Sequence, residues 1–216
     1  MLWRSQGKNV AAPSSGTPLE DVRFVVLDTE LTSLDAGTNR LLSVGALAMQ
    51  GSRIRVGETF YRVVNPRVEL PPEAVVIHRL VPEEVAQAQE PEPVVRELAD
   101  FLRGALAVGH FVEIDVKVLK KEFALARLKF DWPMIDTARV FRWLDLRRKA
   151  REQGWEHGSE DLSLAALAAR YQIDVAQAHH ALDDAWVTAR LWQRLLFELS
   201  SEGVRTVKQA LRIGRP

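Results

Sequence analysis

Apolar positions in the first half of the chain follow the patterns of β-strands. A continuous β-prone run over 23–27, apolar from Phe24 onward, is typical of a strand that is buried on both faces. Two further strand-like runs, 41–49 and 54–64, are separated by residues 50–52, where a glycine predicts a hairpin turn. The short apolar run 106–108 predicts one more buried strand.

From residue 92 onward, apolar positions recur mainly at helical spacing. They predict helices over 92–103, 113–128, 136–150, 161–171, 181–199 and 204–212. The first three predicted strands come before the helices, and the fourth lies between two of them. This order predicts an α/β fold, with a central mixed β-sheet flanked by α-helices. We therefore expect an N-terminal arm over 1–20, one catalytic domain over 21–200, and a C-terminal helix or tail over 201–216.

Composition narrows the class of protein. The 216 residues are 47% hydrophobic and 27% charged, which is typical of a soluble globular domain. No apolar run approaches the roughly 18 residues of a membrane span, and the N-terminus does not resemble a signal peptide. We therefore expect a cytoplasmic protein with no membrane partner.

Composition also limits the chemistry. The chain has no cysteine, so any metal must be held by Asp, Glu, His or backbone oxygen. The net charge of zero excludes a protein that coats nucleic acid by bulk electrostatics. Binding at one strand end stays open, because bound cations would supply local positive charge.

Two carboxylates follow the first strand at a spacing of two. Side chains alternate across a strand, so Asp28 and Glu30 are expected on the same face. Like charges this close repel each other unless a cation lies between them. The alternative is that the strand ends here and water solvates both side chains.

A third acid lies on an apolar helical face. On a helical wheel, Asp115 falls within the apolar arc of the helix predicted over 113–128. A carboxylate that faces a core needs a partner, a metal or a raised pKa. Glu122 shares this arc, and interaction of Asp115 with the helix dipole is an equally good explanation.

The last long helix carries the fourth acid. Asp184 lies on a mostly apolar stripe, whereas Asp183 shares a face with Arg190 and Arg194 and has an ordinary surface explanation. His179 is five residues before Asp184, which places it on the loop that leads into the helix. A structural role is the alternative for this histidine.

Three segments together resemble the DnaQ-like family of DEDD exonucleases. Residues 28–34 read DTELTSL, like the family's D-x-E-T-T-G-L; residues 110–115 read HFVEID, like its H-N-x-x-F-D; residues 179–185 read HHALDDA, like its H-x-A-L-x-D-A. The order and separations agree across roughly residues 22–199. The histidine before the last acid is similar to the DEDDh subgroup, which includes the exonuclease domain of DNA polymerase III epsilon subunits.

The resemblance implies a ribonuclease H-like fold and a metal-dependent 3′→5′ exonuclease that releases nucleoside 5′-monophosphates. It implies that Asp28, Glu30, Asp115 and Asp184 hold two Mg²⁺ or Mn²⁺ ions, for which carboxylate oxygens are suitable ligands. It also implies that His179 is the base that accepts a proton from the attacking water.

The resemblance further implies that Leu31, Thr32, His78 and Phe111 contact the substrate. The pair Ile77-His78 is like the start of the family's I-H-G-I. Phe111 stands where the family has Asn, and Leu31 and Ser33 stand where it has Thr and Gly. These departures bear on substrate preference more than on the chemistry.

The expected partner is the 3′ end of a nucleic acid, DNA rather than RNA. About 17 residues follow Leu199, which favours a separate repair or turnover nuclease over a polymerase-bound proofreader. Association with a polymerase and a homodimer both stay open. Two alternatives use the same residues: an end-binding scaffold with impaired chemistry, and a phosphatase or nucleotide-processing enzyme.

Overall fold

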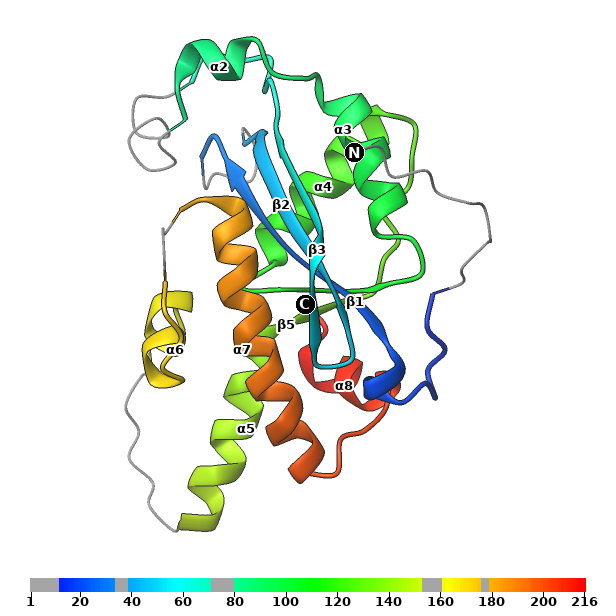
Figure 1. Cartoon of the computed structure of the whole chain (residues 1–216), viewed down its shortest axis with the longest axis vertical. Coiled ribbons are helices and arrows are strands. Elements are labelled where there is room, and N and C mark those ends of the chain that lie inside the picture. Colours follow the sequence, from blue (N-terminus) through cyan, green and yellow to red (C-terminus); the bar gives the residue numbers. More distant parts are fainter. Residues whose placement is uncertain (1–11, 34–38, 71–79, 153–160, 176–178) are drawn as a thin grey trace.

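The β-prone run that begins at residue 23 forms the middle strand of a five-stranded sheet (Figure 1). The computed structural model describes residues 12–33, 39–70, 80–152, 161–175 and 179–216. The strands are β1 (Arg23–Leu31), β2 (Leu41–Gln50), β3 (Arg53–Val63), β4 (Leu106–Gly109) and β5 (Met134–Asp136), in the order β3-β2-β1-β4-β5. The pairs β1–β2 and β2–β3 are antiparallel, and β1–β4 and β4–β5 are parallel. The predicted mixed sheet is therefore confirmed.

The strand β1 continues to Leu31, beyond its predicted end at residue 27. Backbone pairing with β2 carries it on, with Asp28 opposite Gly45 and Glu30 opposite Ser43. Both acids therefore lie within a paired strand, and the alternative in which the strand ends before them is wrong. The sequence pattern does not predict β5, because three residues are too few to show a period.

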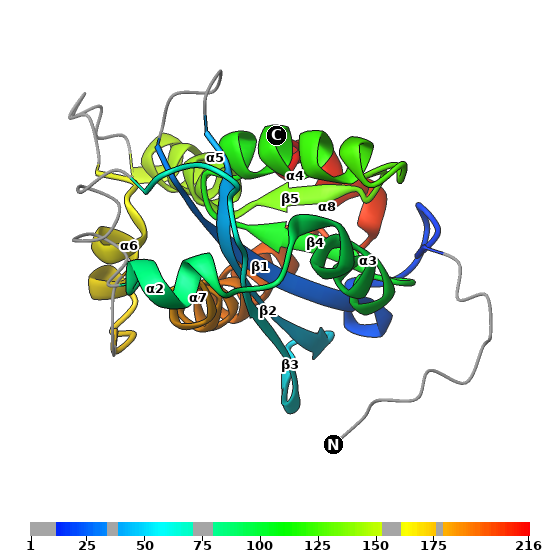
Figure 2. The ribbon, with the colours of Figure 1, turned by 90° about the horizontal axis from the view of Figure 1, so that it is seen from above.

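Helices cover both faces of the sheet, as the view from above shows (Figure 2). On one face, α3 (Pro91–Phe101) and α4 (Glu113–Leu125) pack against the odd-numbered apolar residues of β1, such as Val25 and Leu27. On the other face, Phe24 and Val26 pack against the remaining long helices. These are α5 (Thr137–Glu152), α7 (Ala181–Ser201) and α8 (Val207–Gly214). Because side chains alternate along β1, Asp28 and Glu30 face α7, whereas Thr29 and Leu31 face α4.

Two shorter helices complete the described fold. The helix α6 (Leu164–Arg170) begins three residues later than predicted, because the Ser163 hydroxyl accepts a hydrogen bond from the Ala166 N–H at 3.3 Å and caps it. The helix α2 (Pro82–Ala86) is a single turn that the sequence pattern does not predict. Within the described ranges, no helix combines the length and apolarity that crossing a lipid bilayer requires.

The described part of the N-terminal segment contacts the last helix. The Lys208 N–H donates to the Ser15 carbonyl at 2.8 Å, and the Leu19 N–H donates to the Arg205 carbonyl at 2.8 Å. Leu19, in a short 3-10 helix (Leu19–Asp21), and Val207 in α8 are buried in the same core. The boundaries at residues 20 and 200 stay a prediction.

Candidate active site

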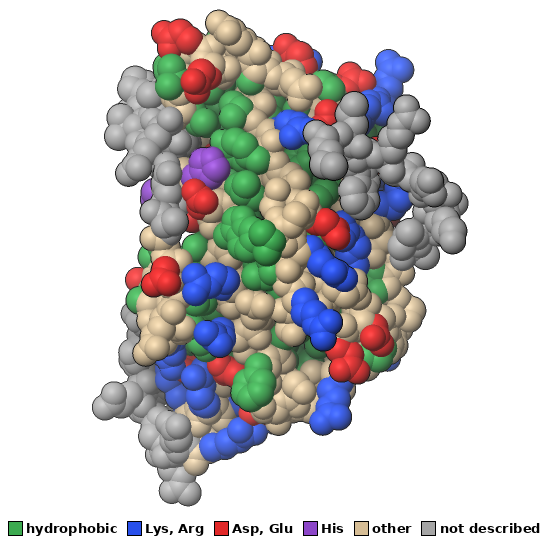
Figure 3. All heavy atoms as spheres, viewed as in Figure 1, with side chains coloured by type: hydrophobic (Ala, Val, Ile, Leu, Met, Phe, Trp, Pro, Cys, Tyr) green, Lys and Arg blue, Asp and Glu red, His purple; other side chains and the backbone are tan. Residues whose placement is uncertain are grey.

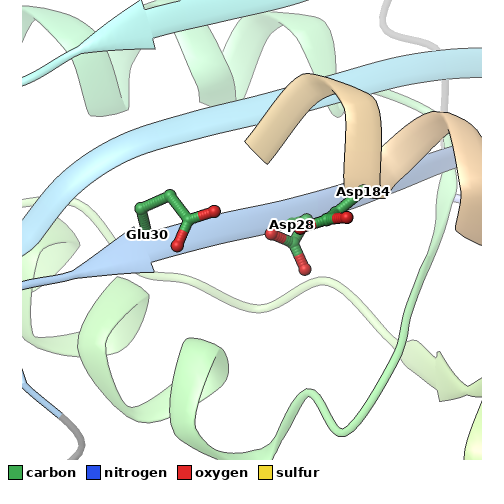
Figure 4. A group of neighbouring side chains, drawn as sticks. All are labelled: Asp28, Glu30 and Asp184. Atoms are coloured by element: carbon green, nitrogen blue, oxygen red, sulfur yellow. The ribbon is translucent and has the colours of Figure 1, made fainter. Parts of the chain in front are cut away.

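Three of the four predicted acids meet on the α7 face of the sheet. Asp28 and Glu30 project from β1, and Asp184 projects from the first turn of α7 toward them (Figure 4). Each offers one carboxylate oxygen, and these oxygens lie within 4.8 Å of one another. Side chains from two elements that are about 150 residues apart in sequence therefore converge, as the spacing and the helical wheel predict.

Glycine at position 45 allows this convergence. Gly45 lies beside Asp28 in the sheet, and the backbone of α7 passes directly over it. A Cβ atom at this position would lie 2.2 Å from the Leu182 nitrogen and 2.3 Å from the Ala181 carbonyl carbon. The sequence shows a glycine inside an apolar strand, which is a known signal of close backbone approach, but not what approaches.

The three carboxylates repel one another. Burial, followed by the charges of Asp115, Glu30 and Asp184, raises the pKa of Asp28 well above its ordinary value. Burial and the charge of Glu30 raise the pKa of Asp184 to about 6, against the opposing effect of the His179 N–H. A divalent cation would remove this repulsion, and a set of carboxylate oxygens matches the ligand preference of hard cations. The donor set therefore fits a divalent metal ion.

Asp115 approaches the site from the opposite face. Pairing of β4 with β1 extends only to Val26, so the next part of β1 is open on that side. There the Thr29 hydroxyl donates to the Asp115 carboxylate at 2.5 Å, and the Thr29 backbone N–H also donates to it. Burial raises the pKa of Asp115 to about 6, although these hydrogen bonds oppose the rise. Asp115 lies near enough to raise the pKa of Asp28, but outside the group of three.

The other buried acid on α4 has a partner of its own. Glu122 lies 3.6 Å from the guanidinium of Arg40, measured from Oε1 to Nη1. This ion pair explains why a second carboxylate falls in the apolar arc of the helix. The two acids of that arc therefore have different environments, and Glu122 has no place in the carboxylate group.

His179 lies on the segment that enters α7, as predicted. The helix begins at Ala181 with His180 as its N-cap, and the side chain of His179 is exposed. Its backbone N–H donates to the Asp184 carboxylate at 3.0 Å. Its φ of 63° lies in the left-handed region, which non-glycine residues rarely adopt.

The predicted substrate contacts have different environments. Leu31 and Thr32 are buried, and the Thr32 hydroxyl accepts a hydrogen bond from the Arg40 N–H at 2.9 Å. Phe111 is 52% exposed on the loop between β4 and α4. His78 lies outside the described residues.

A polar network that sequence reasoning did not assign holds the Phe111 loop. The Phe111 N–H donates to the Asp136 carboxylate at 3.2 Å, and the φ of Phe111 is 51°. The ring of His110 bridges the Thr137 hydroxyl and the Leu162 carbonyl, both at 2.8 Å. Burial lowers the pKa of His110, which favours the neutral ring, and the Leu162 carbonyl accepts a hydrogen bond from Nε2. These hydrogen bonds fix the turn that carries Phe111.

The surface explanation for Asp183 needs correction. Asp183 Oδ2 lies 3.3 Å from His180 Nδ1, whereas the Arg190 guanidinium lies 3.9 Å from Asp174. The predicted pairing of Asp183 with Arg190 and Arg194 is not found among the described residues. The first turn of α7 brings Asp183 closer to the N-cap than to the next turns.

Comparison with known proteins identifies relatives of this arrangement. The RNase T exonuclease family profile matches residues 25–192. The DNA polymerase III subunit epsilon of Salmonella typhimurium is 31% identical over 178 residues, which are 79% of this chain and 70% of that protein. A subunit epsilon-like protein of Rhodobacter capsulatus is 30% identical over 203 residues, but these cover 93% of this chain and only 27% of that protein.

Solved structures share the fold. The chain superposes on exonuclease X in complex with 5′ overhanging duplex DNA with a TM-score of 0.66 at 22% identity, covering 88% of this chain and 98% of that one. Exonuclease I of E. coli in complex with a dT13 oligonucleotide gives a TM-score of 0.70 at 17% identity, covering 85% and 43%. The predicted ribonuclease H-like fold is confirmed.

The close approach at Gly45 predicts a large effect of a small substitution. Gly45→Ala should lower the stability by about 1–3 kcal/mol or more, because the added methyl group overlaps backbone rather than a movable side chain. Thermal denaturation followed by circular dichroism measures the change. Gly57→Ala in β3, where an added Cβ meets nothing within 4 Å, is the matched control and should differ little from the wild type. Equal stability of the two variants would contradict the proposed packing.

Repulsion at the site predicts a stabilising substitution. A carboxyl whose pKa is higher in the folded than in the unfolded protein destabilises the fold as pH rises above the unfolded value. With chelator at pH 7, Asp28→Asn should therefore raise Tm by roughly 2–4 °C, equivalent to about 1 kcal/mol. The gain should shrink toward pH 4, and Asp131→Asn, at an exposed acid, should show no gain. A lower Tm for Asp28→Asn at pH 7 would argue against the repulsion.

Proposed function

The chain belongs to the RNase T exonuclease family, in its DnaQ-like branch, and on this premise we propose that it hydrolyses phosphodiester bonds at nucleic-acid 3′ ends by a two-metal mechanism. The products would be nucleoside 5′-monophosphates. One observation carries the proposal: the Asp28, Glu30 and Asp184 carboxylates meet within 4.8 Å.

The proposed ligands of two Mg²⁺ or Mn²⁺ ions are Asp28, Glu30, Asp184 and Asp115. Asp28 is central, because its pKa responds to each of the other three acids. Asp115 would contribute from the opposite face, directly or through water. When bound, such ions stabilise the charge on the attacking and departing oxygens of a phosphoryl displacement.

His179 is the proposed base. Its exposed imidazole can reach a water molecule and accept a proton from it, which is the usual task of a histidine in general base catalysis. The hydrogen bond from its backbone to Asp184 couples the position of the base to that of a proposed metal ligand. The base and the metal site would therefore stay in a fixed relation.

DNA is the proposed substrate. Two structural neighbours, exonuclease I and exonuclease X, are solved with DNA bound, which supports DNA here. The net charge of the chain is zero, and Lys, Arg, Asp and Glu side chains all occur on the face seen in Figure 3. We therefore expect bulk electrostatic attraction to contribute little to the affinity for DNA. Phe111, which is exposed on its loop, is a proposed substrate contact.

A biological role in repair, proofreading or turnover is also a proposal. The matched region spans about a quarter of the Rhodobacter relative, so the partners of that longer protein do not transfer to this chain. The epsilon subunits among the relatives support a polymerase as one partner to test. Homodimer formation remains a second option.

A degradation assay tests the activity. Single-stranded DNA labelled at its 5′ end should be shortened stepwise from the 3′ end with Mg²⁺ or Mn²⁺, and not with chelator. Asp184→Asn should slow the reaction at least about 100-fold, because the metal contribution is several kcal/mol. Glu113→Gln, at an exposed acid that is ion-paired with Lys117, should retain the wild-type rate.

Each other result has a meaning. Binding without shortening would favour the end-binding scaffold. Release of phosphate from mononucleotides, with the DNA intact, would favour a phosphatase. Shortening that persists in chelator would refute the metal mechanism.

Removal of the proposed base, His179, should lower the rate of hydrolysis without changing the affinity for metal. His179→Ala should lower kcat by about 10²–10⁴-fold, the range for loss of a general base. Calorimetric titration should give an unchanged affinity for Mn²⁺, because the carboxylates remain. A wild-type rate in His179→Ala would remove His179 from the mechanism, and a lost Mn²⁺ affinity would make it a ligand instead.

A further inference from the structure

The start of α7 lies across a row of three residues on neighbouring strands. In the sheet, Asp28 of β1 lies opposite Gly45 of β2, and Gly45 lies opposite Tyr61 of β3. The α7 backbone passes over Gly45. Asp184 therefore reaches the acids on one side, while the N-cap residue His180 reaches Tyr61 on the other.

Tyr61 contacts elements on both sides of this row. Its ring stacks on the imidazole of His180, with ring centroids 4.6 Å apart and planes inclined by 30°. Its hydroxyl forms a hydrogen bond with the Ser43 side chain. Ser43 is buried and lies opposite Glu30 in the pairing of β1 with β2. The Tyr61 side chain thus links β2, the strand that pairs with the acid-bearing β1, to the residue that follows His179.

The Tyr61–His180 stack restrains the backbone at His180 and does not depend on a helix-capping hydrogen bond. His180 has an extended conformation, and its side chain makes no capping hydrogen bond to α7. Asp183 Oδ2, at 3.3 Å from Nδ1, lies beside the same imidazole. The ring of His180 is therefore held between β3 and the first turn of α7, and the peptide that it shares with His179 is held with it.

His179 needs such support. Its φ of 63° lies in the left-handed region, which non-glycine residues rarely adopt. Its side chain is exposed, so the direction of the imidazole depends on the backbone that carries it. The hydrogen bond from its N–H to Asp184 is one constraint on this backbone, and the Tyr61–His180 stack is a second.

We propose that Tyr61 and His180 are positioning residues, whose stacked rings fix the entry to α7 and hold His179 over the carboxylate site. This inference rests on the proposed role of His179 as the base. It requires the two rings and not the Tyr61 hydroxyl, and it assigns no contact with substrate or metal to either residue.

Kinetic variants test the proposal with single-stranded DNA and Mn²⁺. Tyr61→Leu and His180→Ala should each lower kcat by about 10- to 100-fold, the effect of misplacing a reacting group by about 1 Å, with unchanged KM and Mn²⁺ affinity. Tyr61→Phe, which keeps the ring, should retain the wild-type kcat. In a His179→Ala background, Tyr61→Leu should have no further effect, because the group that it positions is gone.

A second measurement does not depend on activity. Hydrogen exchange at the His179 amide should be at least about 10-fold faster in Tyr61→Leu than in the wild type and unchanged in Tyr61→Phe, since opening of the loop exposes this N–H. His180→Ala removes no helix cap, so we expect this variant to fold. It should also exchange the His179 amide faster than the wild type, and it replaces Tyr61→Leu in this measurement if that variant does not fold.

The outcomes are distinguishable. An inactive wild type would refute the proposed exonuclease function, and the exchange rates would still report whether the stack holds the loop. An unchanged exchange rate in both Tyr61→Leu and His180→Ala would overturn the positioning role. If the wild type is active, the positioning role would also be overturned when Tyr61→Leu lowers kcat by the same factor in the wild-type and in the His179→Ala background.

Discussion

Mutual repulsion of carboxylates is the constraint on which this structure depends. Asp28, Glu30 and Asp184 meet within 4.8 Å, and burial with neighbouring charge raises the pKa of Asp28. Such a cluster costs stability unless a cation occupies it, so its presence in the middle of a well-packed sheet indicates a functional demand. The rest of the fold holds these anions together: β1 supplies two of them, and the close approach of α7 over Gly45 supplies the third.

The two faces of β1 contribute different residues to the site. The face toward α7 carries the three converging acids, whereas the face toward α4 meets Asp115 through Thr29. This division follows from strand alternation, together with the early end of β4 pairing at Val26. The loop before α7 adds His179, whose backbone is tied to Asp184. One helix start thus determines where both the last acid and the proposed base lie.

Much of this arrangement follows from sequence alone, for physical reasons. The strand period places Asp28 and Glu30 on one face, and the helical wheel separates Asp184 from Asp183. Sequence does not show that Asp115 approaches from the other face, because that depends on where two strands stop pairing. It also does not show that α7 crosses Gly45, since a glycine in a strand signals a close approach but does not identify the segment that approaches. Strand β5 is too short for any periodic signal.

Anomalous diffraction from crystals grown with Mn²⁺ would test most directly whether the carboxylate cluster binds metal. We expect anomalous density between the carboxylates of Asp28, Glu30 and Asp184, with Asp115 as a direct or water-mediated neighbour. We also expect this density to disappear in crystals of Asp28→Asn. Ordered Mn²⁺ elsewhere on the molecule, with none among these carboxylates, would contradict the proposed metal site.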